Sequence, residues 1–259
     1  MADFLDVLTR DAKQTINNGY YKVSTQISTP SSSLKKAILE SKQIPIITEI
    51  KTASPSLGTI KRNPNIEKVA RAMENGGAVG ISVLVEPKHF EGSLSHLTKV
   101  RKAVGLPILM KDIIISHTQL ETASKIGANA VLLIAALFER RYCERDIHEM
   151  ISQAHSKGLE VLLETHNEDE FRSAINSNAD LVGINNRNLG TLQIDLAVTK
   201  RILEKNDARE KIVVSESGIR TPDDLRFLLK CGAHAFLIGS AIMMAENLEK
   251  KVQEFVTTS

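Results

Sequence analysis

Short apolar stretches recur at regular intervals along the chain, and the segments between them have the spacing of helices. Within each stretch, apolar and β-branched residues follow one another almost without interruption, which is typical of strands buried on both faces. The eight stretches are residues 44–51, 78–86, 107–115, 130–135, 160–165, 181–186, 211–217 and 235–240. Strands that alternate with helices predict a parallel α/β fold, and eight of them predict a single (β/α)8 TIM barrel rather than an open, doubly wound sheet.

Two of the intervening segments carry clear helix boundaries. Thr221 offers an N-cap oxygen and Pro222 suits a first helical turn, while Gly232 closes the segment. A second segment opens at Ser116 and closes at Gly127. These boundaries support helices between the predicted strands.

The length of the chain fits one domain. Its 259 residues match the roughly 250 residues that one such barrel needs. We therefore predict a single barrel domain with residues 1–43 as an N-terminal helical extension. The apolar positions of the first expected helix are spaced four apart, at Phe4, Leu8, Ala12 and Ile16. This spacing predicts an amphipathic helix that packs against the barrel.

The first predicted strand ends in two opposite charges. Glu49 and Lys51 are two residues apart, so their side chains project to the same face of a strand. Charges in this position, followed by a Ser-Pro-Ser turn, are what a polar site at the mouth of a barrel requires. A structural ion pair at the rim explains this stretch equally well when it is taken alone.

The same pattern recurs on other predicted strands. Lys111 and Glu164 lie near the ends of their strands, and Asn185 shares a face with Arg187 after a third strand. Each has a separate structural explanation: Lys111 as a rim residue, Arg187 as a surface residue, and Glu164 as a cap of the next helix beside the capping groups of residues 165–167. Because the carboxyl ends of barrel strands share one mouth, we favour one convergent site.

The last two predicted strands end in small residues. Ser217-Gly218 follows one strand and Gly239-Ser240 follows the other. Backbone N–H groups at such residues can approach a ligand closely, and the corresponding loops of this fold commonly bind phosphate. The composition alone is a weak signal, because glycine after a strand often only makes a turn. The position of these residues therefore carries the prediction of a phosphate pocket.

Composition restricts the cellular setting more than the chemistry. Lys and Arg number 33 against 31 Asp and Glu, for a formal net charge of +2, which gives no reason to expect nucleic acid or membrane partners. Cys143 and Cys231 fall in predicted helices and lack metal-ligand spacing. No stretch approaches the length of a membrane span, and the N-terminus lacks the regions of a signal peptide. We therefore expect a soluble, cytoplasmic protein.

The residues at these strand ends are similar to those of a known family. Together they resemble indole-3-glycerol phosphate synthase, over residues 44–243, and six blocks in the right order make the resemblance specific. The blocks are Glu49-Ile50-Lys51 with Ser54-Pro55-Ser56, Ser82-Val83-Leu84 with Phe90 and Gly92-Ser93, Leu109-Met110-Lys111-Asp112, Gly183-Ile184-Asn185-Asn186-Arg187-Asn188-Leu189, Ser215-Glu216-Ser217-Gly218-Ile219 and Phe236-Leu237-Ile238-Gly239-Ser240.

The resemblance implies a decarboxylating lyase of tryptophan biosynthesis. Such an enzyme closes the pyrrole ring of 1-(2-carboxyphenylamino)-1-deoxyribulose 5-phosphate with loss of carbon dioxide and water, and it forms indole-3-glycerol phosphate. The resemblance implies no metal and no organic cofactor. The expected partner is this small phosphosugar-anthranilate substrate, and association with other enzymes of the tryptophan pathway is compatible with that role.

The resemblance also implies roles for individual residues. Lys111 is the general acid that protonates the substrate ketone, and Glu164 assists proton movement on the opposite side. Glu49 and Lys51 serve the later dehydration, and Lys51 also holds an anionic group. Asn185 and Ser217 join the catalytic residues. The residues expected to bind or orient the substrate are Arg187, Ser54, Ser56, Phe90, Glu216, Gly218, Gly239 and Ser240.

The chain departs from the family pattern at a few positions. Ile113 stands where an aromatic residue often follows Lys-Asp, and Ala53 stands where a basic residue is frequent. Thr165 and Asn188 are also unusual. These departures affect substrate packing and loop motion rather than the proton carriers. The protonation state of Lys111 stays open, because neighbouring cations would lower its pKa and neighbouring carboxylates would raise it.

Two rival functions remain to be weighed. Phosphoribosylanthranilate isomerase, another phosphosugar barrel, would require a Cys at the end of the first strand, where this chain has Lys51. A non-catalytic barrel that binds a sugar phosphate would be expected to lose a charged catalytic group. Here Glu49, Lys51, Lys111 and Glu164 are all present. We therefore favour the lyase.

Overall fold

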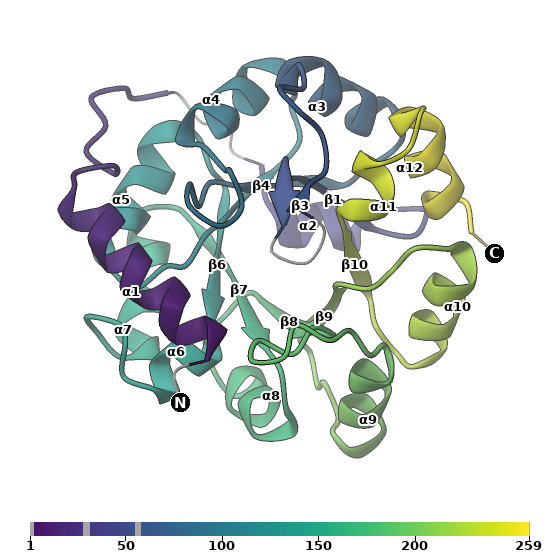
Figure 1. The fold of residues 1–259 in the computed structure, drawn as a ribbon. Helices are drawn as coiled ribbons and strands as arrows, with labels where there is room; N and C mark the ends of the chain where they lie inside the picture. The colour runs from purple at the N-terminus through teal and green to yellow at the C-terminus, as the bar shows by residue number, and fades with distance from the viewer. Residues whose placement is uncertain (1–2, 28–31, 55–57, 259) are drawn as a thin grey trace.

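The chain folds into a closed barrel of eight parallel strands (Figure 1). The computed structural model describes residues 3–27, 32–54 and 58–258. In chain order the barrel strands are β1 (Ile46–Ile50), β4 (Gly80–Leu84), β5 (Ile108–Lys111), β6 (Ala130–Ile134), β7 (Glu160–Thr165), β8 (Leu181–Asn185), β9 (Ile212–Glu216) and β10 (Ala235–Ile238). Each pairs in parallel with its neighbours, and β10 closes onto β1. The predicted (β/α)8 barrel is confirmed.

Helices surround the barrel and follow the predicted boundaries (Figure 1). Ser116 caps the helix that ends at Gly127, which has a φ of 97°. Thr221 caps another helix, with Pro222 in its first turn. The surrounding helices are α3 (Ile66–Asn75), α4 (Leu94–Ala103), α5 (His117–Ile126), α6 (Ala135–Glu139), α7 (Ile147–Ser156), α8 (Glu168–Ile175), α9 (Ala197–Lys205), α10 (Pro222–Lys230), α11 (Ser240–Met243) and α12 (Leu248–Val256). A short hairpin, β2 (Ala53–Ser54) and β3 (Gly58–Thr59), follows β1.

The strands divide the core into two apolar layers. Side chains such as Ile81 and Val83 point outward and pack under the helices. Side chains such as Leu109, Leu132 and Leu162 point inward and fill the barrel. Because strand residues alternate between faces, the next inward positions toward the carboxyl ends are free to carry other groups. The inner layer thus forms an apolar floor beneath the mouth of the barrel.

The N-terminal extension covers both ends of the barrel. Helix α1 (Phe4–Asn17) lies over the β5 to β7 side in Figure 1, with Leu5 and Leu8 buried against the inner layer. Helix α2 (Leu34–Leu39) packs under the opposite end, where the Leu34 side chain occupies the space that a Cβ at Gly80 would need. The predicted amphipathic helix is confirmed.

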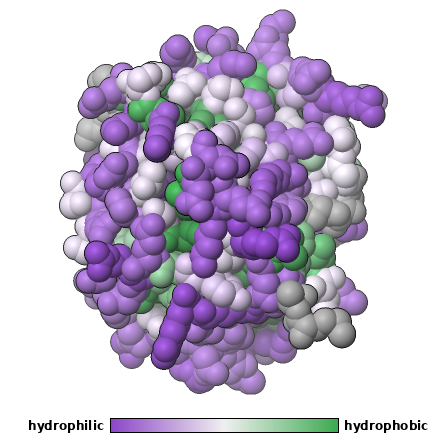
Figure 2. Space-filling model, turned by 60° about the vertical axis from the view of Figure 1, so that its left-hand side comes forward, coloured by the Kyte–Doolittle hydropathy of each residue, from purple (hydrophilic) through white to green (hydrophobic). Residues whose placement is uncertain are grey.

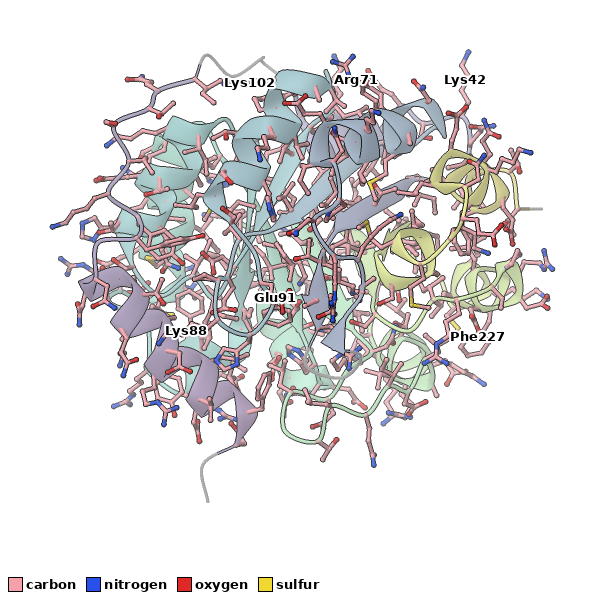
Figure 3. All side chains as sticks on the ribbon, turned by 45° about the horizontal axis from the view of Figure 1, so that its top comes forward. Lys42, Arg71, Lys88, Glu91, Lys102 and Phe227 are labelled. Carbon is pink, nitrogen blue, oxygen red and sulfur yellow. The ribbon has the colours of Figure 1, made fainter. Side chains whose placement is uncertain are left out.

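Ion pairs tie α1 to two loops at the mouth. Asp6 Oδ1 lies 2.8 Å from Arg140 Nη1, just beyond α6. Asp11 Oδ2 lies 2.8 Å from His89 Nε2 in the loop after β4. Lys88 Nζ, 3.6 Å from Asp11 Oδ1, reaches α1 from the same loop (Figure 3). Contacts to two separate loops fix the direction of α1 across the mouth.

A buried hydrogen bond anchors the chain that leaves α1. The Tyr21 hydroxyl donates to Asp112 Oδ2 over 2.6 Å, and Gln119 Nε2 donates to the same oxygen over 3.4 Å. Burial raises the pKa of Asp112 to about 6, although the Tyr21 bond opposes that rise. Since Asp112 follows Lys111 directly, this anchor holds the end of β5 as well as the extension.

The surface is largely polar, and both cysteines are outside the barrel strands. The face in Figure 2 is mainly hydrophilic, with small hydrophobic areas between polar side chains. Cys143 lies in the bend between α6 and α7, so its predicted place in a helix is wrong; Cys231 follows the last residue of α10. Both thiols are half-buried. Within the described part of the chain, we find no helix with the length and apolar character to cross a membrane.

Replacing Tyr21 with Phe should destabilise the protein in a pH-dependent way. The folded-state pKa of Asp112 is raised, so its contribution to stability falls as pH rises from about 4 to about 6. Loss of the Tyr21 donor raises the pKa of Asp112 further, so the loss of stability continues to higher pH. We expect Tyr21→Phe to lower the free energy of unfolding by about 1.5–3 kcal/mol at pH 8 and by less at pH 5. Urea unfolding at both pH values measures this.

The matched control is Tyr20→Phe, which removes a donor to a neutral acceptor. The Tyr20 hydroxyl donates to the Val85 carbonyl over 2.9 Å. Its loss should cost about 0.5–1.5 kcal/mol at either pH. Equal, pH-independent losses for the two variants would contradict the role given to Asp112.

Candidate active site

A cavity of about 1010 Å³ opens at the carboxyl ends of the strands, beneath α1. Phe4, Leu5 and Leu8 of α1 line one side of it. The site residues predicted from the sequence that line it are Glu49, Lys51, Ser54, Phe90, Lys111, Glu164, Asn185, Arg187, Glu216, Ser217, Gly218, Gly239 and Ser240. Ser56 lies outside the described residues. The structure therefore brings together all the predicted site residues that it describes.

The charges at the end of β1 form a close pair. Lys51 Nζ lies 2.9 Å from Glu49 Oε1, and the side chains are 15% and 5% exposed. Both project to the mouth, as strand alternation predicts. A Cβ at Gly239 would lie 2.6 Å from Glu49 Oε1 and 3.0 Å from Lys51 Cε. Glycine at this position is therefore required by the neighbouring ion pair.

Lys111 lies between two buried carboxylates. Its Nζ is 3.1 Å from Glu164 Oε2 and 3.5 Å from Glu216 Oε2. These partners come from two other strands, because β7 brings Glu164 and β9 brings Glu216 to the same point. Burial alone would lower the pKa of Lys111, but the two carboxylates outweigh it and raise the pKa above its ordinary value. Lys111 is therefore an ammonium at neutral pH.

The two carboxylates that Lys111 touches differ in their ionisation. Burial would raise the pKa of Glu164, but Lys111 and His166 together lower it. Burial, with the nearby charges of Glu164 and Glu49, raises the pKa of Glu216 to about 8 in spite of Lys111. Glu164 is therefore a carboxylate and Glu216 a carboxylic acid near neutrality. Within the described structure, Glu216 Oε1 is buried without a hydrogen-bond partner.

The residues after β8 form a turn that points into the mouth. The Arg187 backbone N–H donates to Asn185 Oδ1 over 3.0 Å, and Arg187 Nη1 donates to the Leu192 carbonyl over 3.1 Å. Arg187 is half-buried and lines the cavity. It is thus a fixed cation of the site, and its interpretation as a surface residue is wrong.

The ends of β9 and β10 bring close-packed backbone to the cavity. Ser217 and Gly218 both have left-handed backbone, with φ values of 66° and 90°. A Cβ at Gly218 would lie 2.5 Å from Ile194 Cγ2, so only glycine fits there. Ser240, which opens α11, lines the cavity beside Gly239. The predicted phosphate residues therefore face one region of the mouth.

Two polar residues of the site were missed in the sequence. His166 was interpreted only as a capping group, but Asn167 caps α8, while His166 Nε2 lies 3.2 Å from Glu164 Oε1. Asn186 points away from the cavity, and its Nδ2 donates to the carbonyls of Glu216 and Ser217 over 3.0 and 3.2 Å. Strand alternation could have placed Asn186 outside the mouth, but its partners on β9 are far away in the sequence.

The departures from the family pattern have local explanations. Ile113 is buried and lines the cavity as an aliphatic wall. Thr165 points outward and its hydroxyl donates to the Gly183 carbonyl over 2.7 Å. Asn188 Oδ1 accepts from the backbone N–H of Gly190 over 2.8 Å. None of these three residues displaces Lys111, Glu164, Glu49 or Lys51. Among the described residues, we find no group of three or more His, Cys, Asp or Glu residues arranged to hold a metal ion.

A closed (β/α)8 barrel with half-buried lysines and buried carboxyl groups at its mouth places the protein in the class of (β/α)8-barrel enzymes. The family model described as indole-3-glycerol phosphate synthase matches residues 6–255, and the chain belongs to this family.

Curated relatives agree with this assignment. The chain is 46% identical over 230 residues to indole-3-glycerol phosphate synthase of Methanocaldococcus jannaschii, covering 86% of this chain and 82% of the relative. It is 41% identical over 233 residues to the protein of the same name from Shouchella clausii, covering 89% of each.

Two solved structures at low sequence identity show the fold only. Thiamine phosphate pyrophosphorylase from Pyrococcus furiosus superimposes with a TM-score of 0.59 at 18% identity, covering 86% of this chain and 96% of that one. N-acetylmannosamine-6-phosphate 2-epimerase from Clostridium perfringens also gives a TM-score of 0.59, at 14% identity, covering 83% of this chain and 93% of that one.

Replacing Glu216 with Gln should make the protein increasingly stable, relative to the parent protein at the same pH, as pH rises. A carboxyl group with a raised folded-state pKa binds a proton more tightly in the folded chain, so its contribution falls between the ordinary pKa, about 4.5, and about 8. Glu216→Gln removes this fall. We therefore compare the free energy of unfolding of Glu216→Gln with that of the parent protein at each pH. The difference, variant minus parent, should be larger at pH 8 than at pH 5.5 by at least about 1 kcal/mol.

Urea unfolding at the two pH values gives the comparison, and Glu204→Gln is the control. Glu204 is 60% exposed and pairs with Lys200 on the surface. Its replacement should change stability by the same small amount at both pH values. A flat pH response of Glu216→Gln would show that Glu216 is ionised throughout.

Proposed function

We propose that this chain converts 1-(2-carboxyphenylamino)-1-deoxyribulose 5-phosphate into indole-3-glycerol phosphate, carbon dioxide and water. The observation that carries the proposal is that two separate clusters, each of a lysine with one or two carboxyl groups, lie at one mouth of the barrel. Lys111 lies between Glu164 and Glu216, while Lys51 pairs with Glu49. A reaction with a ring closure and a later dehydration needs proton donors in two phases, and two such groups meet that need.

Lys111 acts in the ring closure. The aromatic carbon attacks the ketone carbon, and negative charge develops on the ketone oxygen as the carbon–carbon bond forms. An ammonium with a raised pKa is a poor acid toward a neutral ketone, but it stabilises the developing alkoxide and protonates it readily. Glu164 keeps Lys111 charged and in place. Loss of carbon dioxide then leaves its bonding electrons in the ring.

Lys51 and Glu49 act in the dehydration. The hydroxyl formed from the ketone must leave as water, and a proton must be lost from the ring system. Because Lys51 Nζ and Glu49 Oε1 are 2.9 Å apart, one pair can supply an acid and a base to neighbouring atoms. This pair lies on β1, two strands away from both β5 and β9, so it is a second lysine–carboxylate pair at the same mouth and suits a second phase of the reaction.

Cations and backbone groups hold the two anionic ends of the substrate. Arg187 and Lys51 are two of the cations that line the cavity, and they can pair with carboxylate or phosphate. Ser217, Gly218 and Ser240 offer hydroxyl and backbone donors for phosphate. Asn185 orients the substrate beside them, and Glu216, as an acid, can donate to a substrate oxygen. Ile113 and Phe90 provide apolar surface for the anthranilate ring.

Incubation with the substrate, followed by indole fluorescence, tests the function directly. The decisive variant is Lys111→Arg, because arginine keeps the positive charge between Glu164 and Glu216 but does not release a proton. We expect the parent protein to form product, and Lys111→Arg to fold normally with kcat lowered by about 10²–10⁴.

Lys111→Ala is the less informative variant for this test. It leaves the buried Glu164 carboxylate without Lys111 and should also lose about 3–5 kcal/mol of stability. Circular dichroism and thermal unfolding separate this effect from lost chemistry. Turnover by Lys111→Arg at the parent rate would remove Lys111 as the general acid, and absence of product from the folded parent protein would overturn the proposed function.

Ser240→Asp tests the phosphate pocket. Gly239 is unsuitable, because a side chain there would strike Glu49 and Lys51. An aspartate at position 240 would repel the phosphate group, and we expect KM to rise at least about tenfold while kcat changes less. Ser240→Ala is the control and should raise KM only a few-fold. Equal KM values for Ser240→Asp and the parent would place the phosphate elsewhere.

A further inference from the structure

His166 lies between Glu164, which lines the cavity, and Glu170 in the first turn of α8. It follows β7 directly, and its side chain is 12% exposed. Nε2 lies 3.2 Å from Glu164 Oε1, and Nδ1 lies 3.3 Å from Glu170 Oε2. The other oxygen of Glu164, Oε2, is the one that contacts Lys111. The carboxylate of Glu164 therefore lies between His166 on one side and Lys111 on the other.

We propose that His166 is a positioning residue that keeps Glu164 ionised and turned toward Lys111, and so decides which of the two carboxyl groups beside Lys111 carries a proton. This inference rests on the proposed function of the site. His166 itself reaches the reacting atoms only through Glu164.

The charged cluster around Lys111 is nearly symmetric. Lys111 touches both Glu164 and Glu216, and both carboxyl groups are buried. One cation cannot hold two close buried carboxylates equally well, so one of them tends to keep a proton. Glu164 has a second cation within 3.2 Å, whereas the only ion-pair partner of Glu216 among the described residues is Lys111. His166 therefore breaks the symmetry in favour of an ionised Glu164.

The orientation of His166 is fixed from behind by Glu170. Glu170 Oε2 accepts the backbone N–H of His166 over 2.8 Å, and Glu170 Oε1 accepts from Asn167 Nδ2 over 2.6 Å. Asn167 Oδ1 in turn accepts the Glu170 N–H over 2.9 Å as the N-cap of α8. This reciprocal arrangement holds the Glu170 carboxylate against the imidazole. The ring is thus locked from the side that faces away from the cavity.

Two flanking carboxylates favour the imidazolium form. Burial would lower the pKa of His166, but Glu164 and Glu170 together raise it to about 9. Lys111 and Glu216 lie beyond Glu164, and Glu139 of α6 faces Glu170 from the outer side. Nε2 has no in-line acceptor in the described structure, so its attraction to Glu164 at 3.2 Å is that of an ion pair.

A structural role alone does not explain this arrangement. The N-terminus of α8 is already capped by Asn167, so the helix does not need the His166 side chain. A histidine retained only for packing would also gain nothing from a carboxylate at each ring nitrogen. Through its contacts with Glu164 and Glu170, His166 connects the first turn of α8 to the cavity.

His166→Gln tests the proposal, with His155→Gln as the matched control. Gln keeps a hydrogen-bond donor but carries no charge. His155 forms a similar pair, 2.8 Å from Asp180 Oδ2, on the surface outside the cavity. We expect His166→Gln to lower kcat by about 10–100-fold with KM changed less than about threefold. The acid limb of the kcat profile should move to higher pH, because Glu164 loses a cation. His155→Gln should leave both unchanged.

His166→Lys restores a positive charge and should recover part of the lost kcat and return the acid limb toward its original pH. A fall in kcat with an unmoved acid limb, or no recovery in His166→Lys, would reduce His166 to a structural residue. Parent-like kcat and pH profile in a folded His166→Gln would overturn the proposal outright.

A measurement without turnover keeps this inference separate from the proposed function. Carbon-13 resonances of the glutamate side-chain carboxyl groups can be titrated in the parent and in His166→Gln, with Glu164→Gln to assign the Glu164 signal. We expect the Glu164 resonance to titrate at higher pH in His166→Gln. An unshifted titration refutes the role of His166 even if the enzyme is active, and a shifted one supports it even if the substrate is wrong.

Discussion

The rest of the site depends on one buried interaction, the contact of Lys111 with Glu164 and Glu216. Removing three ionisable groups from water is costly, and the attraction between them compensates only when their geometry is fixed. The barrel fixes it by bringing the ends of β5, β7 and β9 to one point above an apolar floor. Burial raises the pKa of both carboxyl groups, but Lys111 and His166 lower that of Glu164, so Glu164 is ionised and Glu216 is protonated. Chemical asymmetry thus follows from the packing of the barrel.

The N-terminal extension strengthens these interactions by limiting access of water. Leu5 and Leu8 of α1 form an apolar wall of the cavity, and an ion pair to Arg140 and a hydrogen bond to His89 fix the helix in place. Charges interact more strongly where water is excluded, so a covered mouth makes each lysine–carboxylate contact more effective. The bond from Tyr21 to Asp112 connects this cover to the residue beside Lys111. The cover and the charged cluster are therefore mechanically linked.

The sequence predicted most of the architecture because local rules governed it. Apolar runs placed all eight barrel strands, and caps such as Ser116 and Thr221 placed helix ends. Alternation along β1 predicted correctly that Glu49 and Lys51 share a face. The failures concern contacts between distant segments. Lys111 has partners on β7 and β9, and the reason for glycine at position 239 is a pair of side chains on β1.

The barrel, the family resemblance and the residues at the mouth could be predicted from the sequence, because strand alternation and apolar periodicity are properties of neighbouring residues. How those residues act on one another depends on the folded chain. The charge of Lys111, the difference between Glu164 and Glu216, and the place of His166 all depend on distances of a few ångströms between different strands. Electrostatic energy depends on those distances and on burial, and barrel closure sets both.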